Sequence, residues 1–276
     1  LTVNLAQATA NGGMHIEEGR LVVLGDVVTA DAKSEVGGYQ AFTKVYDMTA
    51  LSSSANGMLS VSLFGNVASN ALDASEMKFA DNFKGTLEIT HGSLIIRPTA
   101  VMGGVSQIRL DGGGLALYNG ATMALPIEVG AEGAWIFGRL GDTAYSGAVT
   151  GAGNLTLVVN NEVDNLTFSG SMTLGDYTVQ DENGVATTAK SNLVKKGGYA
   201  AYITGEDNNI NISGGVIAEA GQLVFQNQQT LHSLTVNGSS TVTLEKNATI
   251  GSQTINNGTL VVGTDDAAAA VSFTDT

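Results

Sequence analysis

The clearest candidate for catalytic chemistry in this sequence is a pair of carboxylates, Asp111 and Glu132, which are 21 positions apart. Two carboxylates that face each other can supply the acid and base of polysaccharide hydrolysis, and together with calcium and a basic residue they can support elimination. The spacing matters only if the chain winds back on itself once every 21 or so residues, because the two side chains then stack on neighbouring turns. Solvated turn positions are the more ordinary role of such residues, and we expect that role for both.

The other charged residues do not form an obvious site. A lyase would need a Lys or Arg base near the carboxylates, and the one adjacent basic pair is Lys195-Lys196. Acidic pairs occur at Glu17-Glu18 and Asp265-Asp266, and Asp31, Glu35, Glu206 and Asp207 lie in expected loops. The turn Glu206-Asp207-Asn208-Asn209 could hold calcium incidentally, but it is not one of the tandem nonapeptides that bind calcium between turns.

His15, His91 and His232 lie far apart and without the spacing of zinc ligands or of a Ser/His/Asp triad. We expect them at turns or on the surface. Trp135 lies in a strand-like Trp-Ile-Phe run, so we expect partial burial rather than a platform for sugar rings. The sequence therefore predicts no catalytic, cofactor-binding or metal-binding residue.

The composition excludes several classes of protein. Gly occurs 36 times and Pro twice in 276 residues, against typical frequencies of about 7% and about 5%, which excludes collagen and Pro-rich linkers. An apolar content of 43% is too high for a disordered chain. With 26 acidic and 12 basic residues the formal net charge is −14, so the surface repels nucleic acids and acidic lipids. The absence of Cys excludes disulfides and thiolate sites.

No run of residues is long and apolar enough for a membrane helix, so we expect no direct membrane insertion. The first residues, LTVNLAQATANGG, lack the basic and apolar regions of a signal peptide. We therefore expect an exported protein whose signal peptide has already been removed.

Short strand signals dominate the chain. Runs of Leu, Val, Ile and Thr alternate with Gly, Asn, Asp and Ser, and six Asn-Gly pairs mark turns. In the middle of the chain the expected strands begin about every seven residues, at Leu87, Leu94, Val101, Ile108, Leu115 and Thr122. The segments 71–80 and 186–196 are the nearest candidates for a turn of helix within a loop.

This spacing predicts an all-β fold, a right-handed parallel β-helix (β-solenoid) with three short strands per coil. A β-sandwich would need longer strands at wider intervals. We expect a single domain over residues 1–276, with roughly thirteen coils and a length of roughly 60 Å. The rhythm breaks at residues 30–56 and 180–201, which we interpret as loop insertions that project from the rod.

Four motifs between Leu110 and Leu157 resemble a known repeat. They are, in order, LALYNGAT from Leu115, PIEVG from Pro126, YSGAV from Tyr145 and GAGNLTL from Gly151. Their order resembles the autotransporter-associated β-strand repeat of bacterial autotransporter passenger domains, and the segment Phe83 to Leu94 resembles a weaker copy. The resemblance implies a parallel β-helix on the bacterial cell surface or secreted from it. The final residues, VSFTDT, do not match the membrane barrel that ends such proteins, so we expect a cleaved passenger or another export route.

These observations favour a non-enzymatic structural or adhesive protein, located outside the cell or on its surface. Its partners would be a host, matrix or glycan surface, or a second copy joined end to end; no nucleic acid and no cofactor are expected. The first alternative is a self-assembling extracellular filament subunit, because the ends of a β-helix carry unpaired backbone groups. The second alternative is a polysaccharide-active enzyme or tailspike that uses Asp111 and Glu132.

Overall fold

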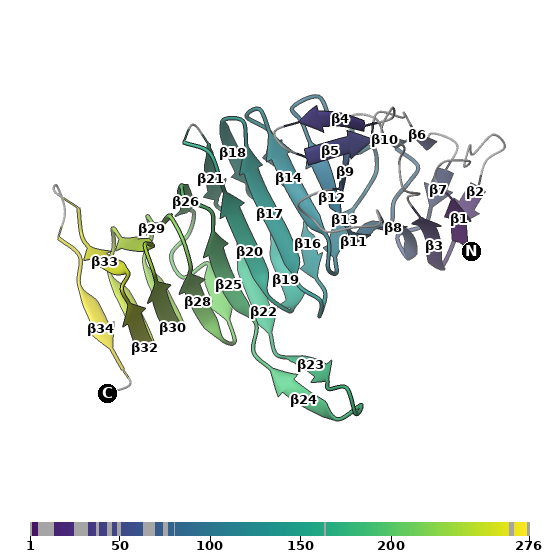
Figure 1. The fold of residues 1–276 in the computed structure, drawn as a ribbon. Coiled ribbons are helices and arrows are strands. Elements are labelled where there is room, and N and C mark those ends of the chain that lie inside the picture. Colours follow the sequence, from purple (N-terminus) through teal and green to yellow (C-terminus); the bar gives the residue numbers. More distant parts are fainter. Residues whose placement is uncertain are drawn as a thin grey trace.

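The computed structural model describes residues 2–4, 14–24, 33–36, 39–42, 46–48, 51–62, 70–73, 77–79, 81–162, 164–264 and 268–274. Every regular element in these ranges is a strand, and most strands stack in parallel into a β-solenoid of about nine turns. The predicted all-β solenoid is confirmed. Right-handed winding, the rule for parallel crossover connections, stays a prediction. Figure 1 shows an elongated molecule with the first and last strands at opposite ends.

Three sheets run along the solenoid. Sheet 1 contains, in spatial order, β1 (Thr2–Asn4), β3 (Gly19–Leu24), β8 (Gly57–Ser62), β11 (Thr86–His91), β13 (Gln107–Leu110), β16 (Ile127–Val129), β19 (Val149–Ala152), β22 (Met172–Gly175) and β27 (Ile210–Ile212). Sheet 2 contains β34 (Val271–Phe273), β32 (Ala248–Asn256), β30 (Gln229–Asn237), β28 (Gly215–Ala218), β25 (Asn192–Lys196), β20 (Leu155–Val159), β17 (Ala134–Arg139), β14 (Gly114–Tyr118), β12 (Ser93–Ile96), β9 (Asn70–Asp73), β5 (Tyr39–Phe42) and β4 (Lys33–Val36). Sheet 3 contains β15 (Thr122–Met123), β18 (Asp142–Tyr145), β21 (Asn165–Phe168), β26 (Ala200–Ile203), β29 (Gln222–Phe225), β31 (Thr241–Leu244) and β33 (Thr259–Val262).

Three further pairs lie outside these sheets. Two are parallel, namely β2 (Met14–Ile16) with β7 (Leu51–Ser53) and β6 (Tyr46–Met48) with β10 (Met77–Phe79). The third is the antiparallel hairpin of β23 (Tyr177–Gln180) and β24 (Ala186–Ala189).

The coil has three strands, as predicted. From β13 onward the chain passes through sheets 1, 2 and 3 in turn, first as β13, β14 and β15 and then as β16, β17 and β18. In sheet 2, Leu94 pairs with Leu115, Leu115 with Ile136 and Ile136 with Leu157, each step being 21 residues. All four side chains are fully buried. They form an aliphatic column inside the solenoid, and each contributes about 1.5–3 kcal/mol by leaving water.

The expected number of thirteen coils was wrong, because about nine turns are formed, which corresponds to roughly 40 Å of stacked strands. The estimate divided the chain by a constant 21 residues, whereas some turns carry insertions. The largest insertion in a described turn lies between β20 and β25, where Leu155 pairs with Leu193, 38 positions later.

The projecting segments differ in their bounds from the predicted loops. In the predicted loop 180–201, the hairpin β23/β24 leaves the rod (Figure 1), whereas Asn192–Lys196 returns to sheet 2 as β25. In the first one, 30–56, strands β4 and β5 form an antiparallel hairpin that joins sheet 2 through β9. Each hairpin can be added without disturbing the columns, because its two ends lie side by side.

Two local expectations were wrong. Val101 does not begin a strand: it lies in a turn segment and is 63% exposed. The nearby Pro98 has no backbone N–H to donate to a neighbouring strand. The segments 71–80 and 186–196 contain no helical turn among their described residues, which form strands β9 and β10 and strands β24 and β25.

A lysine occupies the aliphatic column of sheet 2. Lys195 pairs with Leu157 and is fully buried. Its Nζ donates hydrogen bonds to the backbone oxygens of Lys196 (2.6 Å), Gly197 (2.8 Å) and Ala220 (3.2 Å). Burial lowers the pKa of Lys195 to about 8. Because successive side chains of a strand point to opposite faces of the sheet, Lys195 points inward and Lys196 outward, and the two lysines do not form a basic pair.

The burial of Lys195 predicts a pH dependence of stability. Below about pH 8 the amine is protonated in both states, whereas between its folded pKa of about 8 and its ordinary value of 10.5 the unfolded chain binds the proton more tightly. The free energy of unfolding of the wild type should therefore rise with pH relative to Lys195→Met, by up to about 3 kcal/mol between pH 7 and pH 10.5.

Urea denaturation at a series of pH values measures this difference. Leu157→Met is the control: it replaces a residue of the same column that does not titrate and keeps Lys195. A difference between wild type and Lys195→Met that stays flat or falls with pH would contradict the assignment.

Candidate functional site

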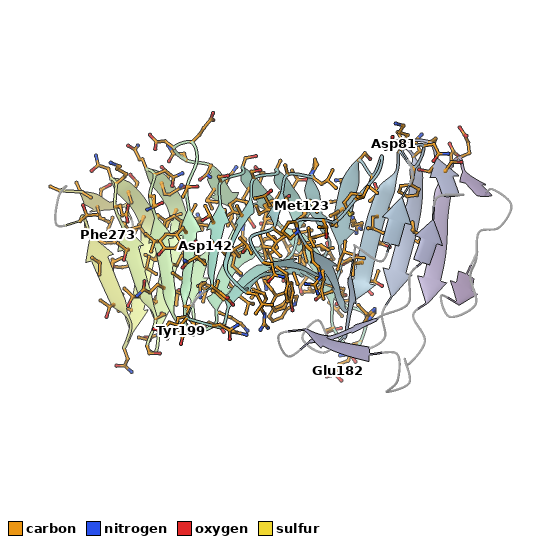
Figure 2. All side chains as sticks on the ribbon, turned by 90° about the horizontal axis from the view of Figure 1, so that it is seen from above. Asp81, Met123, Asp142, Glu182, Tyr199 and Phe273 are labelled. Atoms are coloured by element: carbon orange, nitrogen blue, oxygen red, sulfur yellow. The ribbon has the colours of Figure 1, made fainter. Side chains whose placement is uncertain are left out.

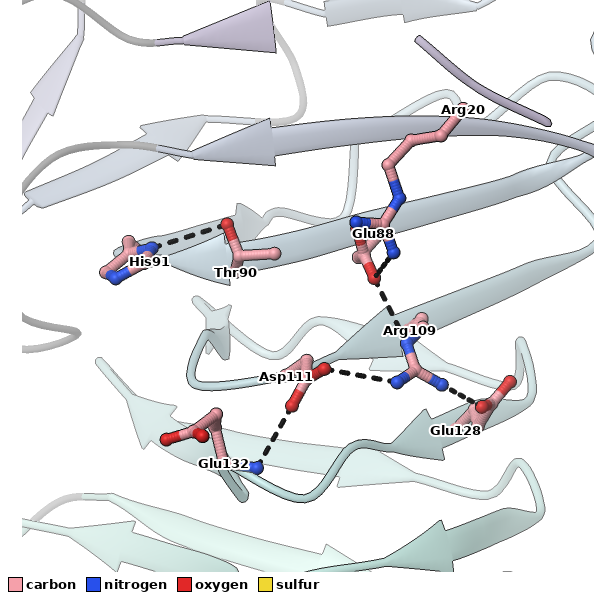
Figure 3. A network of polar contacts seen from close by, with 8 residues as sticks. All are labelled: Arg20, Glu88, Thr90, His91, Arg109, Asp111, Glu128 and Glu132. Carbon is pink, nitrogen blue, oxygen red and sulfur yellow. Dashed lines mark hydrogen bonds and ion pairs between the residues drawn. The ribbon is translucent and has the colours of Figure 1, made fainter. Parts of the chain in front are cut away.

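The solenoid brings Asp111 and Glu132 onto neighbouring turns. The Asp111 carboxylate, however, bonds to the backbone of Glu132 and not to its side chain. The Oδ1 atom of Asp111 accepts a hydrogen bond from the backbone N–H of Glu132 at 3.0 Å. Its Oδ2 atom accepts one from Arg109 Nη2 at 3.1 Å. Both contacts are drawn in Figure 3. The carboxylate of Asp111 thus joins two turns, while Glu132 is exposed.

Asp111 belongs to a row of charges on the outer side of sheet 1. Glu88, Arg109 and Glu128 are register partners on three successive strands, β11, β13 and β16. Arg109 donates from Nε to Glu88 Oε1 at 3.1 Å and from Nη1 to Glu128 Oε1, and Arg20 Nη2 lies 2.9 Å from Glu88 Oε1. We call Arg20, Glu88, Arg109, Asp111 and Glu128 the charge ladder (Figure 3).

The charge ladder encloses a buried carboxylate. The side chain of Glu88 has no exposed area, whereas those of Arg109 and Arg20 are 24% and 49% exposed. Within the described part of the chain, Glu88 Oε2 has no hydrogen-bond partner. Burial lowers the pKa of Arg109, but Glu128, Asp111 and Glu88 raise it, and the net shift is upward. The guanidinium therefore stays charged, and its role is to compensate carboxylates across successive turns.

The predicted acidic turns also have structural roles where they are described. Asp207 Oδ1 accepts a hydrogen bond from the backbone N–H of Gln228 at 2.8 Å. Asn209 accepts hydrogen bonds from the side-chain amides of Asn227 (3.1 Å) and Gln229 (2.8 Å). These amides hold the corner between sheets 3 and 1. Among the described residues, no group of three or more His, Asp or Glu side chains is arranged to hold a metal ion.

The other candidate residues are scattered. Glu17, Glu18 and Glu206 are exposed. Asp31, Asp265 and Asp266 lie outside the described residues, as do the side chains of Glu35 and His15. His91 is exposed, with its Nδ1 atom 3.3 Å from Thr90 Oγ1, and His232 is exposed on β30. The structure does not bring His91 and His232 together.

Trp135 is half-buried, as expected, but on the outer side of sheet 2 rather than in the main core. Its ring stacks beside Phe137 with 6.1 Å between centroids, and Lys196 Nζ lies 5.5 Å from the indole centroid. Nearby, Arg97 lies over the ring of Tyr118 at 5.5 Å. These cation–π contacts stabilise the outer cluster, and Lys196 occupies the position that a stacked ligand would need.

A polar groove near β27, β30 and β32 was not predicted. Hollows of about 450, 350 and 240 Å³ adjoin one another, because Thr249 lines the first and third and Gln228 and Asn247 line the second and third. We define the polar groove by its polar lining residues Asp207, Asn211, Gln226, Gln228, Thr230, His232, Lys246, Asn247 and Thr249. The sequence signal that could have revealed it is the pair Thr230 and Thr249, which are register partners 19 positions apart.

The comparisons with known proteins give no match: no family model, no curated protein and no solved structure is similar to this chain. The resemblance to autotransporter repeats therefore rests on the four quoted motifs. Three of these motifs overlap strands β14, β16 and β20, and the motif YSGAV runs from the end of β18 into β19. Among the described residues there is no helix long and apolar enough to cross a membrane.

The charge ladder predicts a large effect of one substitution. Glu88→Ala removes the buried partner of Arg109 and Arg20, so the free energy of unfolding should fall by about 3 kcal/mol or more. Glu132→Ala removes an exposed carboxylate and should change it by less than about 0.5 kcal/mol. Chemical denaturation followed by circular dichroism measures both, and equal effects would contradict the structural role of the ladder.

Proposed function

We propose that this protein is a non-enzymatic structural or adhesive β-solenoid of the bacterial cell surface or the extracellular space, similar in kind to an autotransporter passenger domain. The observation that carries the proposal is the elongated stack of turns, which presents regular rows of exposed polar side chains. Such a stack is stiff, because each turn is paired by backbone hydrogen bonds to the turns beside it.

One row on sheet 1 illustrates this surface. Thr150, Thr173 and Asn211 are register partners on β19, β22 and β27, and all three are exposed. Register partners on neighbouring parallel strands lie about 4.8 Å apart. A surface that repeats the same groups at a fixed spacing can bind a repetitive ligand at several points, and weak contacts then sum to firm attachment. Figure 2 shows side chains along the length of the rod.

Of the two carboxylates that would support an enzyme, that of Asp111 is occupied. Asp111 is bonded to Arg109 and to the backbone of Glu132, and Arg109 is bonded to Glu88 and Glu128 as well. An acid–base pair for glycoside cleavage would instead need two carboxyl groups facing a common space for substrate and water. This arrangement supports attachment rather than turnover.

Adhesion and turnover can be measured separately. Beads that carry the chain should be retained under flow on at least one of an epithelial cell layer, an extracellular-matrix protein coat and a mucin coat, at shear that removes albumin-coated beads. Incubation with neutral and acidic polysaccharides should release no reducing ends. Retention no better than albumin on every surface would overturn the proposal. So would steady sugar release by the wild type that Asp111→Asn abolishes.

A second candidate function is a filament subunit, favoured by the end of the solenoid at β33 and β34. There the inward columns continue into exposed apolar side chains, because Val236 pairs with Ile255, Leu244 with Val262 and Ile250 with Phe273. Ile255 is 45%, Val262 44% and Phe273 41% exposed. A second copy that stacked on β33 and β34 would bury these three side chains.

Self-assembly can be tested with one variant and one control. Phe273→Asp should dissociate assemblies seen by light scattering and electron microscopy, because it places a charge in the end-to-end contact. Val101→Asp changes a more exposed residue (63%) on the side of the rod and should leave assemblies unchanged. Isolated short rods from the wild type at high concentration would exclude the filament.

A further inference from the structure

We infer that the polar groove binds a neutral oligosaccharide that lies extended across β30 and β32. This inference rests on the proposed function, since it names the class of ligand to which the adhesive rod would attach. It follows from the shape of the groove, the chemistry of its lining and its charge.

The groove forms where the repeat of the solenoid changes length. Leu193 pairs with Val216, 23 positions later, whereas Val216 pairs with Leu234, 18 positions later. At this place the ladder of sheet 1 ends with β27. The first halves of β30 and β32, which include Thr230 and Thr249, continue past it, and β34 pairs with the first half of β32. The change of coil length thus interrupts a flat sheet and leaves the larger hollow between β27 and β30.

The hollow is too narrow for another strand. The backbones of β27 and β30 stay within 8 Å at several Cα positions, and the backbone N–H of Asn208 donates to the oxygen of Gln228 at 2.7 Å. An inserted strand would need about 4.8 Å on each side. An extended peptide added to the sheet is therefore excluded, and a ligand must lie on the surface of the groove.

The lining presents the groups that recognise sugar hydroxyls. Gln228 and Asn247 are exposed amides. The Oδ1 atom of Asn247 accepts from the backbone N–H of Ala270 at 2.9 Å, and an amide keeps two donors and a second acceptor position for a ligand. Thr230 is exposed and Thr249 half-buried. The Thr249 hydroxyl lies 3.2 Å from Ser272 Oγ, and because a hydroxyl has one donor and two acceptor positions, it can bond a ligand as well. The floor of the larger hollow includes Ile212 and Leu231, which are 7% and 3% exposed. Their side chains offer an apolar contact for the C–H faces of a sugar ring.

The charges favour a neutral ligand. The groove contains the carboxylate of Asp207, which accepts from the backbone of Gln228, together with Lys246 and His232. The acidic and basic groups within the groove are thus nearly balanced, while the whole chain carries a formal net charge of −14. The surrounding field therefore repels anionic polysaccharides, and hydroxyl-rich neutral chains remain.

The test uses the full chain and five probes, the hexasaccharides of β-1,4-glucan, β-1,3-glucan, α-1,4-glucan, β-1,4-mannan and α-1,4-galacturonan. Titration calorimetry should show at least one neutral hexasaccharide binding with a Kd below about 1 mM, with weaker or no binding of the galacturonan. The double variant Thr230→Val with Thr249→Val keeps the shape of both side chains and removes two hydroxyls, and it should weaken binding at least tenfold.

The matched control lies on the same two strands. Thr235 and Thr254 pair in the same way on the second halves of β30 and β32, in sheet 2 and away from the groove. Their double Val variant should bind as the wild type does. Circular dichroism and the denaturation midpoint must agree between the two double variants, so that a loss of binding reports the groove and not unfolding.

Three results would overturn the inference: no binding of any neutral hexasaccharide, preferred binding of the galacturonan, or equal affinity in both double variants. Bead retention distinguishes a failure of the groove inference from a failure of the proposed adhesive function. Beads that adhere although no neutral hexasaccharide binds leave the adhesive function standing and exclude the groove. Soluble saccharide that binds while beads fail to adhere supports the groove and removes the adhesive function.

Discussion

The register between stacked turns is the constraint on which the rest of this structure depends. Each turn must place its inward residues on those of the turn before, as Leu94, Leu115, Ile136 and Leu157 do. A shift of one residue would turn the apolar column outward. Extra chain is therefore accommodated outside the column, and the hairpin β23/β24 adds residues between β22 and β25 while Leu157 still meets its partner, Lys195.

Two buried charges show how the same stack tolerates polar groups on its two sides. Lys195 points inward and is held by the backbone oxygens of Lys196 and Gly197, at the end of β25, and of Ala220, which follows β28 on the next turn. Glu88 points outward and is held by the guanidinium groups of Arg20 and Arg109 from strands on either side of β11. In both cases the fold supplies compensating groups, because a buried charge without partners would cost several kcal/mol.

The polar groove lies where the repeat length of the solenoid changes. While the repeat is constant, a sheet presents the same flat row on each turn. When the step in sheet 2 falls from 23 residues at Leu193 to 18 at Val216, sheet 1 is interrupted and side chains from three strands surround a hollow. Hollows in the surface of a solenoid can thus arise from changes of coil length.

The sequence by itself determined the fold class, because a seven-residue rhythm of apolar residues and turn residues fits three short strands per coil and hardly anything else. It also placed Asp111 and Glu132 on neighbouring turns. Only the tertiary structure decided what those residues do, that Lys195 lies inside and Lys196 outside, and that a groove exists at Thr230 and Thr249. The physical reason is that periodicity specifies which residues face inward within one turn. The partners of each side chain come from other turns, and insertions of variable length decide which turns meet.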